Sequence, residues 1–340
     1  PAGPGPAPRA CGPALGLMES TTSDILAATG GRLLSGSSDT VFSGVGIDSR
    51  QLMPGSLFIA IEGDTHDGHT FAPEVVALGG RGVVVREGRT SDTTLAIYQD
   101  RQVVCISVPD TTRALGDIAA YHRRRMPARI VALTGSNGKT TTRAMTAAIL
   151  NHKGTTLATQ GNLNNEIGLP LTLLQLTEAH TLAVVEMGMN HPGEIDHLGQ
   201  IAAPDIGMII NVAPAHLEGL HSIEGVMHAK GELLRHIAPA GRAILNADDE
   251  YCRRLAETCP VETLLFGFGP EAAIRAADLD SGPRGWAFTL QMPSGEIPVK
   301  LQVPGKFMVA NALAAAAAAY CCDVAPETIQ AGLESVAAVD

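Results

Sequence analysis

The sequence predicts an α/β protein in which a small mixed α/β N-terminal domain precedes a phosphate-loop central domain, whose mostly parallel sheet is flanked by helices. Three observations lead to this prediction. From residue 111 onward, runs of β-branched and apolar residues alternate with helical stretches, a pattern typical of parallel sheets. A glycine-rich loop at residues 134–142 joins one such run to a helix. Before residue 110, shorter strand-like runs alternate with Gly, Asp and Pro turns.

Composition restricts the class of protein. The 340 residues are enough for two or three domains, and 45% hydrophobic with 17% charged residues excludes a globally disordered chain. Aromatic residues make up only 4% and the net charge is −11, so no nucleic-acid partner is expected. The longest apolar run, residues 312–322, is shorter than the roughly 20 residues that span a bilayer, so no membrane insertion is expected.

The cysteines and the first residues bear on location. The six cysteines contain no C-x-x-C pair, which argues against a zinc cage and against a secreted disulfide framework. Residues 1–17 are Pro, Ala or Gly at thirteen positions and contain no apolar stretch of a signal peptide. We expect residues 1–17 to be a disordered or non-native tail, Met18 to be a plausible start, and the protein to be a cytoplasmic monomer.

Residues 18–110 form the predicted N-terminal domain. A helical pattern begins near Thr22 and ends at the glycine pair Gly30 and Gly31, where glycine commonly terminates a helix. Apolar, β-branched runs then predict short strands separated by turns. These strands are expected at residues 45–47, 57–61, 82–85 and 103–108.

Residues 111–340 form the predicted central domain. Asp110 is a suitable N-cap for a helix that runs through Arg125. A turn at residues 293–295 predicts a hairpin between residues 287–290 and 297–303. Helices are expected at residues 308–320 and from Pro326, and strands at residues 130–133, 182–185, 206–212, 243–245 and 261–266.

The loop at residues 134–142 has the features of a phosphate-binding loop. It follows a predicted strand and opens a helix, so backbone N–H groups and the helix N-terminus would face an anion. Leu133 stands where the general pattern has its first glycine, and a glycine-rich turn with an exposed lysine is the alternative. The expected nucleotide contacts are Gly135, Ser136, Asn137, Gly138, Lys139, Thr140 and Thr141.

Polar residues follow other predicted strands of the same sheet. Parallel strands place their carboxyl ends at one edge, where α/β proteins bind ligands. Glu186 ends one strand, Asn211 and then His216 follow another, and residues 246–249 follow a third. A carboxylate and an imidazole near nucleotide phosphates are interpreted as magnesium ligands, the alternative being solvated strand ends.

Two competing patterns are weaker. Six of the eleven histidines fall between His191 and His236, which makes a zinc hydrolase a rival, but no H-E-x-x-H is present and the spacings match no known zinc cage. Residues 267–272 mimic a dinucleotide-binding turn, but the stretch is short, so a plain turn is expected.

Several motifs together resemble the Mur ligases, the amino-acid-adding enzymes of peptidoglycan synthesis. In the central region these are residues 135–141, 161–170, 186–190, 215–219 and 229–232, which occur in the family's order. Residues 48–50 and 63–71 are similar to the family's UDP-sugar-binding domain. The resemblance covers about residues 20–335. One departure is that residues 306–308 replace the usual His-Asn pair, although Asn311 is retained.

The resemblance implies an ATP-dependent amide ligase that works through an acyl phosphate. Its implied substrates are a UDP-MurNAc-tripeptide and D-Ala-D-Ala, and its implied cofactors are ATP and two Mg²⁺ ions. It implies that Lys230 is carbamylated. The residues it assigns are Lys139, Lys230 and His216 for catalysis; Thr140, Glu186, His216 and Lys230 for metal; Asn311 for the nucleotide; and Ser49, Arg50, Asn164 and Asn165 for substrate.

Two other functions remain open from the sequence. One is another Mur-type ligase with a different amino acid, and the other is a non-catalytic nucleotide-binding module. The family has a third, C-terminal ligase domain of about 100 residues by ordinary domain size, which we expect to be absent after Asp340. We therefore expect this chain alone to bind its ligands without ligating them.

Overall fold

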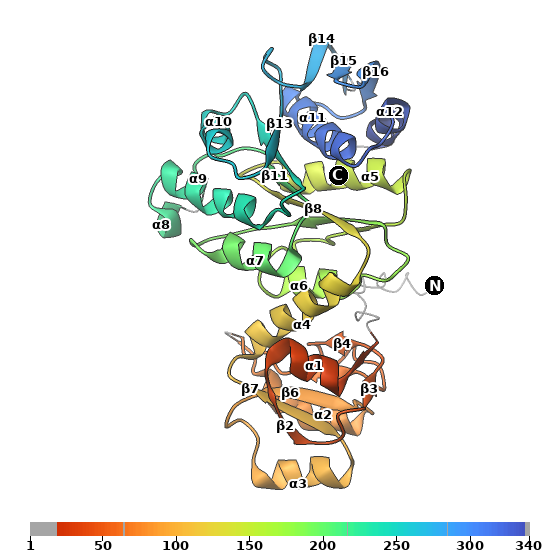
Figure 1. Cartoon of the computed structure of the whole chain (residues 1–340), viewed down its shortest axis with the longest axis vertical. Coiled ribbons are helices and arrows are strands. Elements are labelled where there is room, and N and C mark those ends of the chain that lie inside the picture. Colours follow the sequence, from red (N-terminus) through yellow and green to blue (C-terminus); the bar gives the residue numbers. More distant parts are fainter. Residues whose placement is uncertain (1–18, 64, 216, 284, 337–340) are drawn as a thin grey trace, which may run out of the picture. The chain divides into compact units, whose positions relative to one another are not determined.

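The computed structural model describes residues 19–63, 65–215, 217–283 and 285–336 (Figure 1). They form two compact units that divide between Thr111 and Thr112, and each unit is described by itself. The tail predicted at residues 1–17 and the start at Met18 lie outside the described residues. Within the described part of the chain, no helix has the length and apolar character needed to cross a membrane.

The first unit is built on a five-stranded sheet with the order β2-β7-β6-β5-β4. Strands β4 to β7 are parallel, and β2 is antiparallel to β7. The four parallel strands confirm the predicted apolar runs. Their bounds are β2 Arg32–Ser35, β4 Val45–Gly46, β5 Leu57–Ile59, β6 Gly82–Arg86 and β7 Val104–Val108, and a separate pair joins β1 Ser20–Thr21 to β3 Val41–Phe42.

Helices cover this sheet. Helix α1, Thr22–Thr29, begins with a reciprocal capping box between Thr21 and Asp24 and ends at Gly30, whose φ of 64° suits glycine. The predicted helix from Thr22 is thus confirmed. The other helical segments are η1 Gly68–Phe71, α2 Ala72–Ala77 and α3 Asp92–Asp100, and the core between layers contains Phe58, Val83, Val85, Tyr98 and Cys105.

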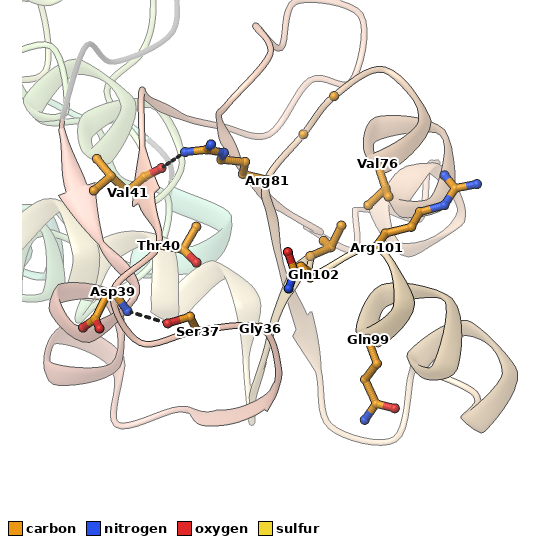
Figure 2. Close-up of a pocket in the computed structure, with 13 residues that line it drawn as sticks. Gly36, Ser37, Asp39, Thr40, Val41, Val76, Arg81, Gln99, Arg101 and Gln102 are labelled. Carbon is orange, nitrogen blue, oxygen red and sulfur yellow. Dashed lines mark hydrogen bonds between the residues drawn. The ribbon is translucent and has the colours of Figure 1, made fainter.

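A hollow of about 940 Å³ lies at the edge of this unit where β6 and β7 begin (Figure 2). The loop at residues 36–41 forms one wall, and the segments around Arg81 and Arg101 form another. Most of the polar residues that line it are solvent-exposed, and Thr40 is half-buried. Asp48 and Asp67, by contrast, follow the ends of β4 and β5, so the motifs that resemble a UDP-sugar site lie at the opposite edge of the sheet.

The second unit contains a nine-stranded sheet with the order β16-β15-β14-β13-β12-β11-β8-β10-β9. Strands β8 to β14 pair in parallel, and β14, β15 and β16 form antiparallel pairs. The α/β fold with a mostly parallel sheet is therefore confirmed. The strands are β8 Arg129–Thr134, β9 Thr156–Ala158, β10 Leu182–Glu186, β11 Ile206–Ile209, β12 Arg242–Asn246, β13 Glu262–Gly267, β14 Ile274–Gly282, β15 Gly285–Met292 and β16 Gly295–Leu301.

The predicted hairpin is confirmed as β15 and β16, but β14 was not predicted. Its second half carries Asp278 and Asp280, so the stretch lacks an apolar run that would mark it as a strand. Residues 267–272 form the expected turn after β13. The helices of this part of the chain are α4 Thr111–Arg125, α5 Lys139–Asn151, α6 Gly168–Leu173, α7 Glu194–Ala202, α8 Leu217–Leu220, α9 Ile223–Gly231, η2 Glu232–His236, α10 Glu250–Glu257, α11 Lys306–Cys321 and α12 Pro326–Glu334.

The alanine-rich run of α11 is core. Residues 312–319 are all fully buried, and α11 packs with α5 and α12 on one side of the sheet (Figure 1). Small side chains allow the helix to approach its neighbours closely, since interiors are packed to the density of organic crystals. Met145 and Ile149 of α5 belong to the same cluster, which fixes the helix that follows the phosphate loop.

We predict that Ala316→Leu destabilises this unit by about 1–3 kcal/mol, because a larger side chain overpacks a filled core. Ala331→Leu, an exposed change on α12, is the matched control and should stay within about 0.5 kcal/mol of the parent chain. Denaturant unfolding followed by circular dichroism measures both. Equal unfolding midpoints for the two variants would contradict the packing described here.

Candidate functional site

The predicted phosphate loop lies between β8 and α5. Gly138 is the N-cap of α5 and has a φ of 79°, a conformation that favours glycine. A Cβ atom at this position would also lie 2.5 Å from Asn311 Oδ1, so α11 approaches the loop backbone closely. The structure therefore brings Asn311, which is 4% exposed, next to the loop.

The residues after β11 brace the loop. Asn211 Oδ1 accepts from the Asn137 N–H at 2.9 Å, and Asn211 Nδ2 donates to the Asn137 carbonyl at 3.0 Å. Ser136 Oγ donates to the Ala213 carbonyl at 2.8 Å and accepts from the Ala213 N–H at 2.9 Å. Lys139 Nζ donates to the Gly135 carbonyl at 2.9 Å. These contacts hold the loop in shape without a ligand.

The carboxylate of Glu186, at the end of β10, is 2% exposed. Its Oε1 accepts from Asn164 Nδ2 at 2.8 Å, and its Oε2 lies 3.2 Å from Arg143 Nη1 and 3.4 Å from Thr140 Oγ1. A buried charge requires such partners, because desolvation otherwise costs several kcal/mol. The structure thus brings together Thr140 and Glu186, which were expected to share a metal, and adds Asn164, which was expected to bind substrate.

Arg143 was not among the residues singled out from the sequence. It lies three residues after Thr140 and four after Lys139, so all three side chains share one face of α5. Its guanidinium also donates to the Gly161 carbonyl at 2.8 Å, which ties the motif at residues 161–170 to the helix. The spacing of four residues between Lys139 and Arg143, about one helical turn, is the sequence signal that could have identified Arg143.

The oxygen ligands present fit a magnesium ion. A threonine hydroxyl and a buried carboxylate facing each other are a donor set that Mg²⁺ accepts, with phosphate oxygens and waters completing an octahedron. His216, the other expected ligand, lies outside the described residues. Among the residues that are described, no group of three or more His, Cys, Asp or Glu side chains is arranged to hold a metal.

Lys230 is buried in α9, with 2% of its surface exposed. Burial, followed by the charge of Lys139, lowers the pKa of Lys230 to about 7. Cys252 acts weakly in the opposite direction, and burial raises the pKa of its own thiol. A substantial fraction of Lys230 is therefore an uncharged amine near neutral pH, and the two lysines lie close enough to repel each other when both are charged.

Other predicted polar residues have local structural contacts. Asn165 Oδ1 accepts from the Gly168 N–H at 2.8 Å, which begins α6. The residue also lines a pocket of about 450 Å³ with Glu166, Gly188, Asn190, Glu194 and His197. Asn246 donates to the Ile210 carbonyl, while Asp248 and Asp249 accept backbone N–H groups of Phe268 and Val212, so these side chains connect neighbouring loops of the sheet edge.

Ser49 and Arg50 lie in the first unit, after β4. Arg50 Nη2 pairs with Asp48 Oδ2 at 2.8 Å and its Nε donates to Asp48 Oδ1 at 2.9 Å. This hydrogen bonding lowers the pKa of Asp48, and the Arg50 side chain remains 85% exposed. The guanidinium is thus oriented by a carboxylate but open to solvent, as an anion-binding arginine needs to be.

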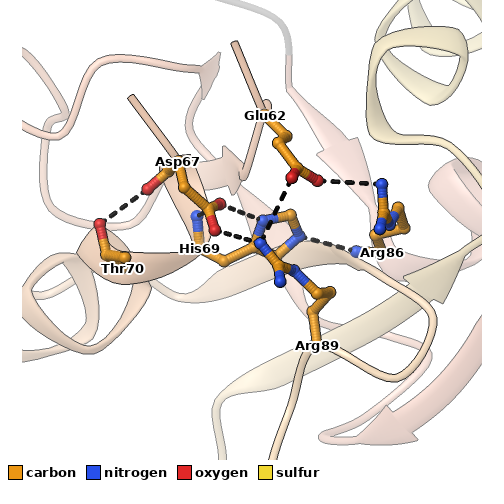
Figure 3. A network of polar contacts seen from close by, with 6 residues as sticks. All are labelled: Glu62, Asp67, His69, Thr70, Arg86 and Arg89. Atoms are coloured by element: carbon orange, nitrogen blue, oxygen red, sulfur yellow. Dashed lines mark hydrogen bonds and ion pairs between the residues drawn. The ribbon is translucent and has the colours of Figure 1, made fainter. Parts of the chain in front are cut away.

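A polar network follows β5 and β6 in the same unit (Figure 3). The ring of His69 contacts Asp67 Oδ1 through Nδ1 at 2.6 Å, and its Nε2 accepts from the Arg86 N–H at 3.0 Å. Arg89 pairs with Asp67, and Arg86 pairs with Glu62 at 2.9 Å. Sequence reasoning covered this stretch only through its resemblance to a UDP-sugar-binding domain.

Comparison with known families gives two matches. The family described as "Mur ligase middle domain" matches residues 133–319, and "Mur ligase family, catalytic domain" matches residues 41–123. The chain is 40% identical over 304 residues to the UDP-N-acetylmuramoyl-tripeptide–D-alanyl-D-alanine ligase of Escherichia coli, covering 88% of this chain and 65% of that relative. The enzyme of that name from Bacillus subtilis is 34% identical, and the match covers 87% of this chain and 62% of that relative. The chain thus spans less than two thirds of their length.

Solved structures are similar as well. A crystal structure of MurF from Acinetobacter baumannii superposes with a TM-score of 0.87 at 34% identity, covering 96% of this chain and 70% of that one. MurF from Thermotoga maritima, solved in complex with ADP, superposes with a TM-score of 0.77 at 27% identity. This match covers 87% of this chain and 66% of that one.

We predict a pH-dependent difference between this chain and Lys230→Met, measured as the free energy of unfolding in carbon-dioxide-free buffer. The folded pKa of about 7 lies below the ordinary lysine pKa of 10.5, so the unfolded chain binds more protons between these values. Stability of the parent chain relative to Lys230→Met should therefore rise as the pH increases from about 7 toward 10.5 and be flat below about 7. The exposed Lys300→Met is the control, and the same pH response in both variants would contradict the burial argument.

Proposed function

Because this chain belongs to the Mur ligase family, we propose that it acts in the ATP-dependent ligation of D-Ala-D-Ala to a UDP-MurNAc-tripeptide. The observation that carries the proposal is the braced phosphate loop with Lys139, at the same sheet edge as the buried pair of Thr140 and Glu186. The similarity to the UDP-N-acetylmuramoyl-tripeptide–D-alanyl-D-alanine ligases of E. coli and B. subtilis supports the choice of substrates.

The reaction brings an anionic carboxylate to an anionic triphosphate, so the site must supply positive charge. An oxygen of the tripeptide carboxylate attacks the γ-phosphorus, the bond to the β–γ bridging oxygen breaks, and ADP leaves. The dipeptide amine then attacks the acyl carbon, loses a proton, and inorganic phosphate leaves. Lys139 and the N–H groups at the start of α5 face the phosphates, so electrostatic stabilisation of the transferring group provides most of the rate enhancement.

Thr140 and Glu186 would hold one Mg²⁺ ion, which supplies positive charge at the phosphate oxygens when bound. Arg143 pairs with the same carboxylate and orients it. We assign a second Mg²⁺ to His216 and Lys230, the latter as its carbamate. The lowered pKa of Lys230, about 7, suits this modification, because nitrogen attacks carbon dioxide only when deprotonated, and the product is an anion.

The remaining substrate and nucleotide contacts are assigned within each unit separately. We assign Ser49 and Arg50 to the UDP diphosphate, since Arg50 is oriented by Asp48 and exposed. We assign Asn164 and Asn165 to the peptide end of the substrate. Asn164 also orients Glu186. Asn311 lies beside the phosphate loop on the nucleotide side.

Residues 306–308, which depart from the family pattern, lie at the start of α11, about one turn before Asn311. Phe307 is 65% exposed, and Lys306 Nζ lies 4.8 Å from the centroid of the Phe268 ring. An exposed aromatic ring can contact a base by stacking, which every base permits.

We predict that the 340-residue chain binds both MgATP and the UDP-MurNAc-tripeptide in calorimetry. Lys139→Ala should weaken MgATP binding roughly 10- to 100-fold, the loss typical of a charged hydrogen bond, and leave the UDP-MurNAc-tripeptide affinity unchanged. The exposed Lys300→Ala is the control. Unchanged MgATP affinity in Lys139→Ala would contradict the phosphate-loop assignment.

Product analysis separates the alternatives. Ligation is assayed both on the 340 residues and on a chain extended over the part of the E. coli relative that is not matched. A chain extended over the remaining length should release phosphate only with the tripeptide and incorporate D-Ala-D-Ala. Incorporation of a different amino acid would identify another Mur-type ligase, and no phosphate release would identify a binding module.

A further inference from the structure

His69 lies in the first unit at the edge where β5 and β6 end, and its side chain is only 6% exposed. Both ring nitrogens have partners. Nδ1 faces the carboxylate of Asp67, and Nε2 faces a backbone N–H group, that of Arg86 (Figure 3). The ring therefore connects the segment after β5 to the end of β6.

These partners determine the tautomer. A backbone N–H can only donate, so Nε2 must carry a lone pair, and the proton of the neutral ring must be on Nδ1, where it donates to Asp67. A second proton on Nε2 would place two donors 3.0 Å apart and break the bond to Arg86. The contact between the two segments thus requires a neutral imidazole.

Two carboxylates and two guanidinium groups surround the neutral ring, so their charges cancel. Asp67 and Glu62 come from the segment after β5, and Arg86 and Arg89 from the end of β6 and the turn that follows it. Asp67 also accepts from the His69 N–H at 3.0 Å. His66, in the same segment, is exposed.

The position in the sheet connects this network to the substrate. β4, β5 and β6 are adjacent and parallel, so the segments after them, carrying Arg50, Asp67 and Arg86, lie side by side at one edge. Ligands of parallel sheets bind at this edge. Arg50 is itself held by Asp48, so the edge presents guanidinium groups whose directions are set by carboxylates.

We propose that His69 is a positioning residue of the UDP-substrate subsite. Its neutral Nδ1–H tautomer fixes the segment of Asp67 against Arg86 and Arg89, and so fixes the surface that a nucleoside diphosphate sugar contacts. This inference rests on the proposed function, because it names the residue that orders the subsite. His69 acts through its neighbours rather than by touching the ligand.

The test compares three variants with the parent chain by calorimetry. His69→Ala should weaken UDP-MurNAc-tripeptide binding about tenfold, the loss expected when a buried hydrogen-bonded group is removed, and leave MgATP binding unchanged. His69→Gln, whose Oε1 can accept from the Arg86 N–H, should recover part of the affinity. His66→Ala, the matched histidine control, should bind like the parent chain. Thermal unfolding of each variant checks that the first unit remains folded.

A spectroscopic readout tests the tautomer without any ligand. Nuclear magnetic resonance of ¹⁵N-histidine-labelled chain should show His69 protonated on Nδ1 and not on Nε2. A ring protonated on Nε2, or equal binding by the alanine variants of His69 and His66, would overturn the inference. A parent chain that binds MgATP but no UDP-MurNAc-tripeptide would overturn the proposed function, and this inference with it.

Discussion

The buried carboxylate of Glu186 is the constraint on which the candidate site depends. A carboxylate that is 2% exposed must be paired, and its partners come from separate segments: Arg143 and Thr140 from α5, and Asn164 from the loop before α6. Satisfying this one group therefore fixes the helix of the phosphate loop against the end of β10. The same contacts place a hydroxyl and a carboxylate together, which is the arrangement that a nucleotide-bound magnesium ion uses.

Local charge at this edge opposes the charge of the whole chain. The protein has a net charge of −11, yet its ligands are anions, so cations must be concentrated where phosphates bind. Lys139 and Lys230 interact closely enough that their repulsion contributes to the low pKa of Lys230. A triphosphate relieves this repulsion, and so does conversion of Lys230 to an anion. Binding of an anionic ligand therefore reduces the repulsion between the two lysines.

Much of the central fold could be predicted because its signals are local. The strand β8, the loop and α5 are contiguous, and Glu186 ends an apolar run in a sheet whose carboxyl ends share an edge. Arg143, the hydrogen bond from the Gly168 N–H to Asn165 and strand β14 were missed. Arg143 acts through a partner more than forty residues away, an asparagine such as Asn165 can bind either a ligand or nearby backbone, and β14 lacks an apolar run. The pairing of His69 with the Arg86 backbone likewise depends on which strands become neighbours.

The affinity for ATP with and without Mg²⁺ tests the central claim most directly, namely that Thr140 and Glu186 form the metal side of a nucleotide site. Calorimetry on the parent chain should show tighter ATP binding when Mg²⁺ is present. Glu186→Gln keeps the shape and the acceptor for Asn164 but removes the charge, so it should lose the strengthening by Mg²⁺ while retaining metal-free ATP binding. An undiminished effect of Mg²⁺ in Glu186→Gln would contradict the account.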